Sequence, residues 1–238
     1  MILVFLKGCA VLIVCKNLTK TYMADGAPFR AVDDVSFSAD KGDFIIILGH
    51  SGSGKTTLLS LVGGLAAPDS GQVLVNKRDN WQQSDADLSE MRNKTVGFIF
   101  QFSSLIPTLT SLENVLLPLS FSKKSAGDQK LAMELLAMVG LGDKINAFPA
   151  QLSGGQQRRV AIARAFINQP DIILADEPTG DLDEETERDI MNIFKKYNQE
   201  NNTTFLIVTH NNELTKLVEK TRTFQMKQGV LREMEAAT

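Results

Sequence analysis

The sequence feature that most constrains this chain is the octapeptide Gly49-His50-Ser51-Gly52-Ser53-Gly54-Lys55-Thr56, which fits the pattern G-x-x-x-x-G-K-[ST]. It lies between an apolar run, Phe44–Leu48, and an apolar helical stretch over residues 57–62. In that context the glycines let several backbone N–H groups point at one set of phosphates, and the helix N-terminus adds its positive end. A Gly/Ser turn without a ligand is the simpler alternative, but it would not need every fixed position of the pattern. We therefore predict a phosphate-binding loop.

The pattern also predicts individual contacts. Lys55 is expected to contact the β- and γ-phosphates of a nucleotide, and the hydroxyl of Thr56 to ligate magnesium. The nucleotide-binding set expected here is the eight residues of the loop together with Thr57. His50 occupies a variable position of the pattern, so no side-chain role follows for it.

A second motif, Ile172-Ile173-Leu174-Ala175-Asp176-Glu177, is an apolar strand that ends in two carboxylates. In α/β sheets such strand ends lie at the edge where ligands bind. We predict that Asp176 holds magnesium, directly or through water, and that Glu177 orients or deprotonates an attacking water. A solvated strand end is the simpler alternative for this motif alone. Combined with the phosphate-binding loop, the pair indicates hydrolysis of a nucleoside triphosphate.

Short apolar runs alternate with helical stretches along the chain. The expected strands cover residues 44–48, 73–75, 96–100, 172–175 and 205–208, and the clearest helix covers residues 184–199. The runs from Phe44, Ile172 and Phe205 lack polar alternation, as central parallel strands covered on both faces do. This order of elements predicts an α/β layered domain.

Two regions depart from that alternation. Residues 111–121 and 128–139 are helical in pattern with no buried strand between them, and another helix is expected to start near Ser153. They predict a helical lobe inserted into the α/β core. Residues 11–38 alternate apolar and polar positions around turn signals at Asp25-Gly26 and Pro28, which predicts a small antiparallel sheet.

Composition narrows the classes of partner. The 238 residues are 43% hydrophobic and 22% charged, ordinary values for a soluble globular domain. A net charge of -3 gives no broad basic footprint for nucleic acid, so no nucleic-acid partner is expected. Cys9 and Cys15 lie too close together to staple a fold and are interpreted as reduced, buried thiols.

The first 15 residues are almost wholly apolar. A membrane span needs about 20 apolar residues, and a secretory signal has its basic residues before the apolar run, whereas Lys7 interrupts this one. We interpret residues 11–15 as a first strand preceded by an extension, although Leu6-Lys7-Gly8-Cys9 loosely resembles a lipoprotein cleavage box. No other stretch is long enough to span a bilayer, so work at a membrane is expected to fall to a partner.

The motif that narrows the class further is Leu152-Ser153-Gly154-Gly155-Gln156. Ser153 can cap a helix, while the two glycines leave its N-terminal amides open to an anion. With this pentapeptide shortly before the Asp-Glu strand, the sequence resembles the ABC ATPase family. The resemblance implies that residues 153–156 bind nucleotide. It also implies a P-loop NTPase fold with a RecA-like parallel core and a small antiparallel β subdomain. The α/β core with this antiparallel sheet is expected over about 11–95 and 160–238, and an inserted helical subdomain over about 102–158.

The resemblance covers nearly the whole chain and implies further roles residue by residue. Tyr22 falls at the position of the adenine-stacking aromatic, although a tyrosine in an antiparallel strand can equally face the core. Gln101 matches the glutamine that senses magnesium and the γ-phosphate, which implies both a catalytic and a metal contact. Asp183 matches a dimer-contacting loop near the nucleotide, and His210 matches the switch histidine that contacts the γ-phosphate.

In this family two copies pack head to tail, and each ATP lies between the phosphate loop of one copy and the signature pentapeptide of the other. Residues 97–102, 105–110 and 113–115 resemble the lipoprotein-releasing and macrolide-exporter branch. Asp181, in place of a frequent asparagine, and Asn211, in place of a common aspartate, depart from it. Neither residue is a predicted phosphate or metal contact.

The sequence therefore predicts a Mg-ATP-hydrolysing homodimer that powers export or lipoprotein extraction. It would work through separate transmembrane permease subunits at the cytoplasmic face of the inner membrane. The partner surface is expected near residues 101–109, where Pro107 turns the backbone. The alternative is an ATPase of the same kind that switches a membrane-bound regulatory or cell-division complex without moving cargo. DNA-repair and translation ABC proteins are set aside because the chain has neither a coiled-coil insertion nor a second cassette.

Overall fold

The central feature of the molecule is a six-stranded, mainly parallel sheet with the order β10-β9-β3-β8-β7-β6. The structure is a computed structural model and describes residues 11–24, 26–121, 128–180, 182–218 and 221–234. The strands are β3 (Phe44–Leu48), β6 (Val96–Ile99), β7 (Ile172–Asp176), β8 (Thr204–Thr209), β9 (Arg222–Lys227) and β10 (Val230–Glu233). All residues of β3, β7 and β8 are buried, because helices or a second sheet cover both faces of these strands. The α/β expectation is confirmed.

A second, antiparallel sheet has the order β2-β1-β4-β5 and lies beside the first. Its strands are β1 (Val11–Ala24), β2 (Ala27–Asp40), β4 (Ser70–Val75) and β5 (Arg78–Asp79). The predicted antiparallel sheet is therefore present. The first strand, expected over residues 11–15, continues to Ala24 through register shifts after Cys15, which interrupt the alternation that marks a strand in the sequence. Tyr22 on β1 pairs with Phe29 on β2.

The helices are α1 (Lys55–Val62), α2 (Asp85–Thr95), α3 (Ser111–Leu116), α4 (Asp128–Met138), α5 (Gly154–Phe166), α6 (Glu184–Asn201) and α7 (Leu214–Leu217). Residues 111–121, expected to be helical, are helical, but the helix changes type in its second half. There the α-helix gives way to a 3₁₀ turn over Leu117–Phe121, because Pro118 has no N–H for an α-helical bond. Shorter 3₁₀ turns cover Asn80–Gln82 and Pro149–Gln151.

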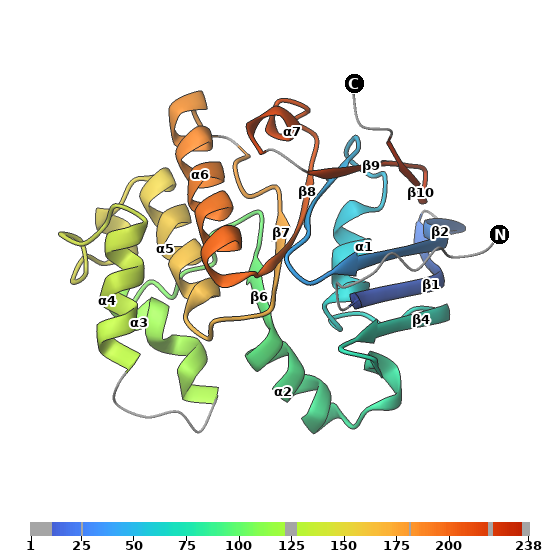
Figure 1. Cartoon of the computed structure of the whole chain (residues 1–238), viewed down its shortest axis with the longest axis horizontal. Coiled ribbons are helices and arrows are strands. Elements are labelled where there is room, and N and C mark those ends of the chain that lie inside the picture. Colours follow the sequence, from blue (N-terminus) through green and yellow to red (C-terminus); the bar gives the residue numbers. More distant parts are fainter. Residues whose placement is uncertain (1–10, 25, 122–127, 181, 219–220, 235–238) are drawn as a thin grey trace.

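The sheet divides the hydrophobic core into two layers. In Figure 1, helices α4, α5 and α6 lie on one side of the sheet, and α1 and the antiparallel sheet lie on the other. Along β3, Ile46 packs into a core shared with α3, α4, α5 and α6, while Ile45 and Ile47 pack into a core shared with α1 and the antiparallel sheet. This alternation is the period of two expected of a strand with two buried faces. Both faces of the sheet are therefore covered, and a site is expected at the edge where the parallel strands end.

The helical lobe is not packed as a separate unit. Helix α5 packs against α3 and α4 and also against β6, so it joins the lobe to the sheet. The boundary near residues 158–160 falls inside this helix and stays a prediction.

Two expectations from the sequence concern the membrane and the cysteines. Among the described residues, no helix combines the length and apolarity needed to cross a bilayer. Cys15 is buried, and burial raises the pKa of its thiol, whereas Cys9 and the proposed extension lie outside the described part of the chain.

Candidate active site

The phosphate-binding loop joins the end of β3 to the start of α1, as the sequence predicts. Gly54 precedes α1 with a φ of 105°, and a Cβ built on it would lie 1.9 Å from the carbonyl oxygen of Ala31. Only glycine fits there, because both the backbone conformation and the close approach exclude a side chain. The Lys55 ammonium donates to the carbonyl oxygens of Gly49, at 2.6 Å, and His50, at 3.1 Å. These bonds hold the buried lysine at the centre of the loop.

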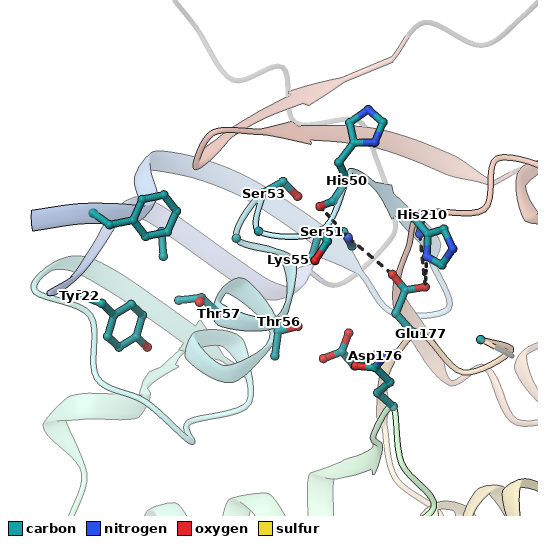
Figure 2. Close-up of a pocket in the computed structure, with 16 residues that line it drawn as sticks. Tyr22, His50, Ser51, Ser53, Lys55, Thr56, Thr57, Asp176, Glu177 and His210 are labelled. Atoms are coloured by element: carbon teal, nitrogen blue, oxygen red, sulfur yellow. Dashed lines mark hydrogen bonds and ion pairs between the residues drawn. The ribbon is translucent and has the colours of Figure 1, made fainter. Parts of the chain in front are cut away.

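Glu177 and His210 come from the loops that follow two neighbouring strands, β7 and β8. One Glu177 oxygen, Oε1, lies 3.6 Å from the Lys55 ammonium. The other, Oε2, accepts from the His210 backbone N–H at 3.3 Å and lies 3.1 Å from its Nδ1. Figure 2 shows Glu177 between the lysine and the histidine. Glu177 itself has a φ of 44°, a conformation that L residues rarely adopt and that clusters at functional sites.

One cavity of about 500 Å³ brings most of the predicted site residues together. It is lined by Tyr22, His50, Ser51, Gly52, Ser53, Gly54, Lys55, Thr56, Thr57, Gln101, Asp176, Glu177 and His210. Tyr22 lies at one end of this cavity and the Glu177–His210 pair at the other (Figure 2). The Tyr22 side chain is 44% exposed, so it is not part of the hydrophobic core.

Three lining residues escaped the sequence reasoning: Phe29, Ala31 and Gly180. The sequence contained a signal for Phe29, because the turn residues expected between the two strands would place this aromatic residue opposite Tyr22, and the two residues do pair. Ala31 and Gly180 contribute through backbone position, which carries no motif.

The residues predicted to hold magnesium offer only oxygen atoms. Thr56 supplies a hydroxyl, Asp176 a carboxylate and Gln101 a side-chain carbonyl, and all three line the cavity. Burial raises the pKa of Asp176, an effect that its hydrogen bond with Thr56 partly offsets. A divalent cation beside this carboxylate would favour its charged form. The donor set and its charge therefore fit Mg²⁺, which prefers oxygen ligands and keeps several waters.

The signature pentapeptide lies outside this cavity. Ser153 caps α5: its hydroxyl accepts from the Gln156 N–H at 3.2 Å, and the Gln156 side-chain oxygen accepts from the Ser153 N–H at 2.9 Å. Gly154 has no atom within 4 Å of the position where a Cβ would stand, whereas a Cβ on Gly155 would lie 3.5 Å from the Thr186 side chain and 3.8 Å from that of Leu182. The residues predicted from this motif thus present an open helix end away from the loop of their own chain.

Asp183 is also outside the cavity. Its carboxylate caps α6, accepting from the Thr186 N–H at 2.9 Å and from the Thr186 hydroxyl at 2.8 Å. These hydrogen bonds lower the pKa of Asp183. Within one chain its side chain therefore serves the helix and not the nucleotide cavity.

Two arginines on α5 donate hydrogen bonds to backbone carbonyl oxygens on either side of Gln101. The sequence alone did not point to them. Arg158 donates to the carbonyl oxygen of Phe100 at 2.6 Å, and Arg164 donates to those of Ser103 and Ser104, both at 2.8 Å. Because α5 begins at the signature, these bonds connect the signature helix to Gln101. The pKa of Arg164 is lowered because burial removes its guanidinium from water.

A glycine-rich loop that feeds a helix, beside two carboxylates at the carboxyl edge of parallel strands, defines a nucleotide-hydrolysing site of the P-loop class. A family model described as ABC transporter matches residues 32–180. Relatives named lipoprotein-releasing system ATP-binding protein LolD match nearly the whole chain. The protein from Idiomarina loihiensis is 41% identical over 92% of this chain and 96% of its own length, and that from Buchnera aphidicola is 44% identical over 87% and 92%.

Two solved structures of the ATP-binding cassette MJ0796 share the fold. One is a dimeric post-hydrolysis state bound to ADP and Pi, and the other is described as a dimeric bacterial ABC transporter cassette. Both are 40% identical to this chain and cover 95% of it and 100% of their own length, with TM-scores of 0.85 and 0.86. The chain belongs to the ABC transporter family, and the resemblance inferred from the signature pentapeptide is confirmed.

Proposed function

We propose that two copies of this chain bind Mg-ATP between them and hydrolyse it to drive a separate membrane-spanning partner of the lipoprotein-releasing kind. The proposal rests on one observation: two helix N-termini that could each bind an anion lie apart within one chain. The phosphate loop at α1 lies in the cavity, whereas the signature end of α5 lies outside it. A symmetric pair, in which each signature faces the other copy's loop, satisfies both ends at once. The relatives of known structure are dimeric cassettes.

In this proposal each cavity residue has one task. The loop amides and Lys55 hold the phosphates, and Tyr22 stacks on the adenine. Glu177 lies at the carboxyl edge of the sheet, where it orients or deprotonates the attacking water. His210 contacts the γ-phosphate and lies within hydrogen-bond distance of Glu177.

Magnesium, when bound by Thr56, Asp176 and Gln101, would neutralise charge on the phosphates. Gln101 would then report the state of the nucleotide to the segment that follows it. Arg164 holds that segment to α5 through Ser103 and Ser104, and Arg158 holds Phe100, directly before Gln101, so a shift at Gln101 reaches the signature helix of the same chain.

The surface proposed for the membrane partner is the aromatic groove between β6 and the helical lobe. A groove of about 580 Å³ there is lined by Leu65, Phe98, Phe100, Leu117, Pro118 and Phe121, among other residues. Phe121 is 78% exposed, and Phe102, next to Gln101, is 75% exposed. Exposed aromatic residues in a concave patch are typical of protein interfaces. A partner seated there, at the inner face of the cytoplasmic membrane, would contact the segment that senses the nucleotide.

The dimer is tested by mixing two defective variants. Lys55→Ala removes a phosphate contact, and Gly154→Asp puts bulk and negative charge where the signature backbone must approach the γ-phosphate. Each protein alone should be nearly inactive. In the mixed dimer one composite site collects both defects, and the other pairs an intact loop with an intact signature, so ATP hydrolysis should partly return.

Nucleotide binding by isolated Gly154→Asp monomers is the control for this experiment. Binding should be close to that of the parent, because the signature does not line the cavity of its own chain. If Gly154→Asp monomers fail to bind ATP while remaining folded, the signature acts within its own chain and the dimer proposal is wrong.

A further inference from the structure

Behind the Glu177–His210 pair, a third acidic residue ties the two catalytic loops together. The Glu187 carboxylate, in the first turns of α6, accepts through Oε1 from the Thr179 hydroxyl and from the Asn211 side-chain amide, both at 2.8 Å. Thr179 lies two residues after Glu177, and Asn211 directly follows His210. Glu187 therefore bridges the loop that carries the predicted base to the loop that carries the predicted switch histidine.

The geometry of both partners is fixed by other bonds. The Asn211 side-chain oxygen accepts from the Glu213 N–H at 2.9 Å, so its NH₂ group is the end that faces Glu187. Thr179 is buried, in a turn closed by the Gly180 N–H on the carbonyl oxygen of Glu177 at 3.1 Å. The Asn211 amide cannot turn away without losing its bond to Glu213, and Thr179 is buried, so the carboxylate sets the distance between the two loops.

We propose that Glu187 is a positioning residue for ATP hydrolysis, which holds Glu177 and His210 at the spacing that the reaction needs. This inference rests on the proposed function. It also gives a physical reason for an asparagine at position 211 in place of an aspartate. An aspartate would keep the acceptor for Glu213 but would place a second carboxylate within hydrogen-bond distance of Glu187, and two like charges at that distance repel. Asparagine at position 211 is thus the partner that Glu187 requires.

Four proteins test this pairing: the parent, Asn211→Asp, Glu187→Gln and the double variant. Asn211→Asp exchanges only the NH₂ donor for an oxygen, so it should lower kcat about tenfold while the KM for ATP stays close to that of the parent. Glu187→Gln retains an oxygen for the Thr179 hydroxyl, and we expect a loss of less than about threefold. In the double variant the amide introduced on α6 can donate to the carboxylate introduced after His210, so kcat should recover to within about threefold of the Glu187→Gln value.

Asn212→Asp is the matched control, because it adds the same charge one residue further on, at an exposed position. It should leave kcat within about twofold of the parent. Thermal melts of all the variants separate a folding defect from a positioning defect. A residue that only stabilises α6 would lower Tm without the change in kcat at constant KM and without recovery in the double variant.

Three results would overturn the inference. They are a parental kcat for Asn211→Asp, an equal loss in Asn212→Asp, and an absence of recovery in a folded double variant. Failure of the proposed function would look different, because the parent itself would then not hydrolyse ATP.

Discussion

Two helix N-termini in this chain have similar local chemistry and different surroundings. Helix α1 begins at Gly54 without a side-chain cap, and helix α5 begins at Ser153 with a complete capping box. Both ends offer backbone N–H groups and the positive end of a helix dipole. Around α1, the antiparallel sheet and the ends of β6, β7 and β8 close a cavity, whereas around α5 the Gly154 position is open. A phosphate site thus needs walls from other elements, and in the proposed dimer the second copy supplies them to the signature end.

In the enclosed cavity around α1, the largest effect is expected from Glu177→Gln. The glutamine keeps the shape of the side chain but cannot take a proton from water, so turnover should fall by about 10² to 10⁴ while ATP binding persists. Unhydrolysed ATP should then hold two copies together, which gel filtration with ATP would detect. A variant that hydrolyses ATP at close to the parental rate would remove Glu177 from the catalytic role.

Tyr22→Ala tests the other end of the same cavity, where the adenine is proposed to stack. Loss of stacking on the adenine costs about 1–3 kcal/mol by analogy with base stacking on aromatic residues, so the ATP concentration for half-maximal rate should rise about 5- to 150-fold. Maximal turnover should change less, and Tyr22→Phe should restore the parental ATP dependence. If Tyr22→Ala leaves that dependence unchanged, the adenine lies elsewhere, and Phe29 is the next candidate.

A pair of cap variants tests whether the open end is more than a helix start. Ser153 caps α5 and Ser84 caps α2 by the same kind of bond, each hydroxyl accepting from a backbone N–H at 3.2 Å. Replacing either serine by alanine should cost about 1 kcal/mol of stability. In the proposed dimer only the Ser153 cap faces the nucleotide of the other copy, so only Ser153→Ala should also lower ATP hydrolysis. Equal hydrolysis by the two variants would reduce Ser153 to a structural cap.

The smallest effect concerns pH and Asp176. Burial raises the pKa of this carboxyl, so the folded chain binds its proton more tightly than the unfolded chain does. The stability that this proton contributes is full below the unfolded pKa, about 3.9, and is lost as the pH rises through the higher folded pKa. Asp176→Asn should therefore melt about 1–4 °C above the nucleotide-free parent at pH 7, and the gain should shrink as the pH is lowered. The gain should come with a loss of Mg²⁺-dependent hydrolysis, and a lower Tm at pH 7 would contradict this account of Asp176.

Much of the fold was predictable because a strand that is buried on both faces is a continuous apolar run in the sequence. The central strands β3, β7 and β8 are continuous apolar runs, and the expected and observed bounds differ by at most one residue at either end. Strands β9 and β10 escaped notice because neither is a continuous apolar run: β10 forms the edge of the sheet, and β9 beside it alternates buried and exposed positions, as in the burial pattern of Arg222–Lys227. Helix α2 has one buried residue, Leu88, so it has no apolar stripe to recognise.

By itself the sequence determined the local chemistry: a loop that only glycines can form, a lysine within it, and carboxylates at the end of a buried strand. These features depend on backbone sterics and on neighbours in the chain, which a motif records. The tertiary structure alone decided which of them share a cavity, since that depends on strand order and on contacts between distant segments. It placed Glu177 beside His210, tied both loops to Glu187, and left Ser153 and Asp183 outside. Contacts such as that of Arg158 with a backbone carbonyl involve no particular partner side chain, so no sequence pattern could have shown them.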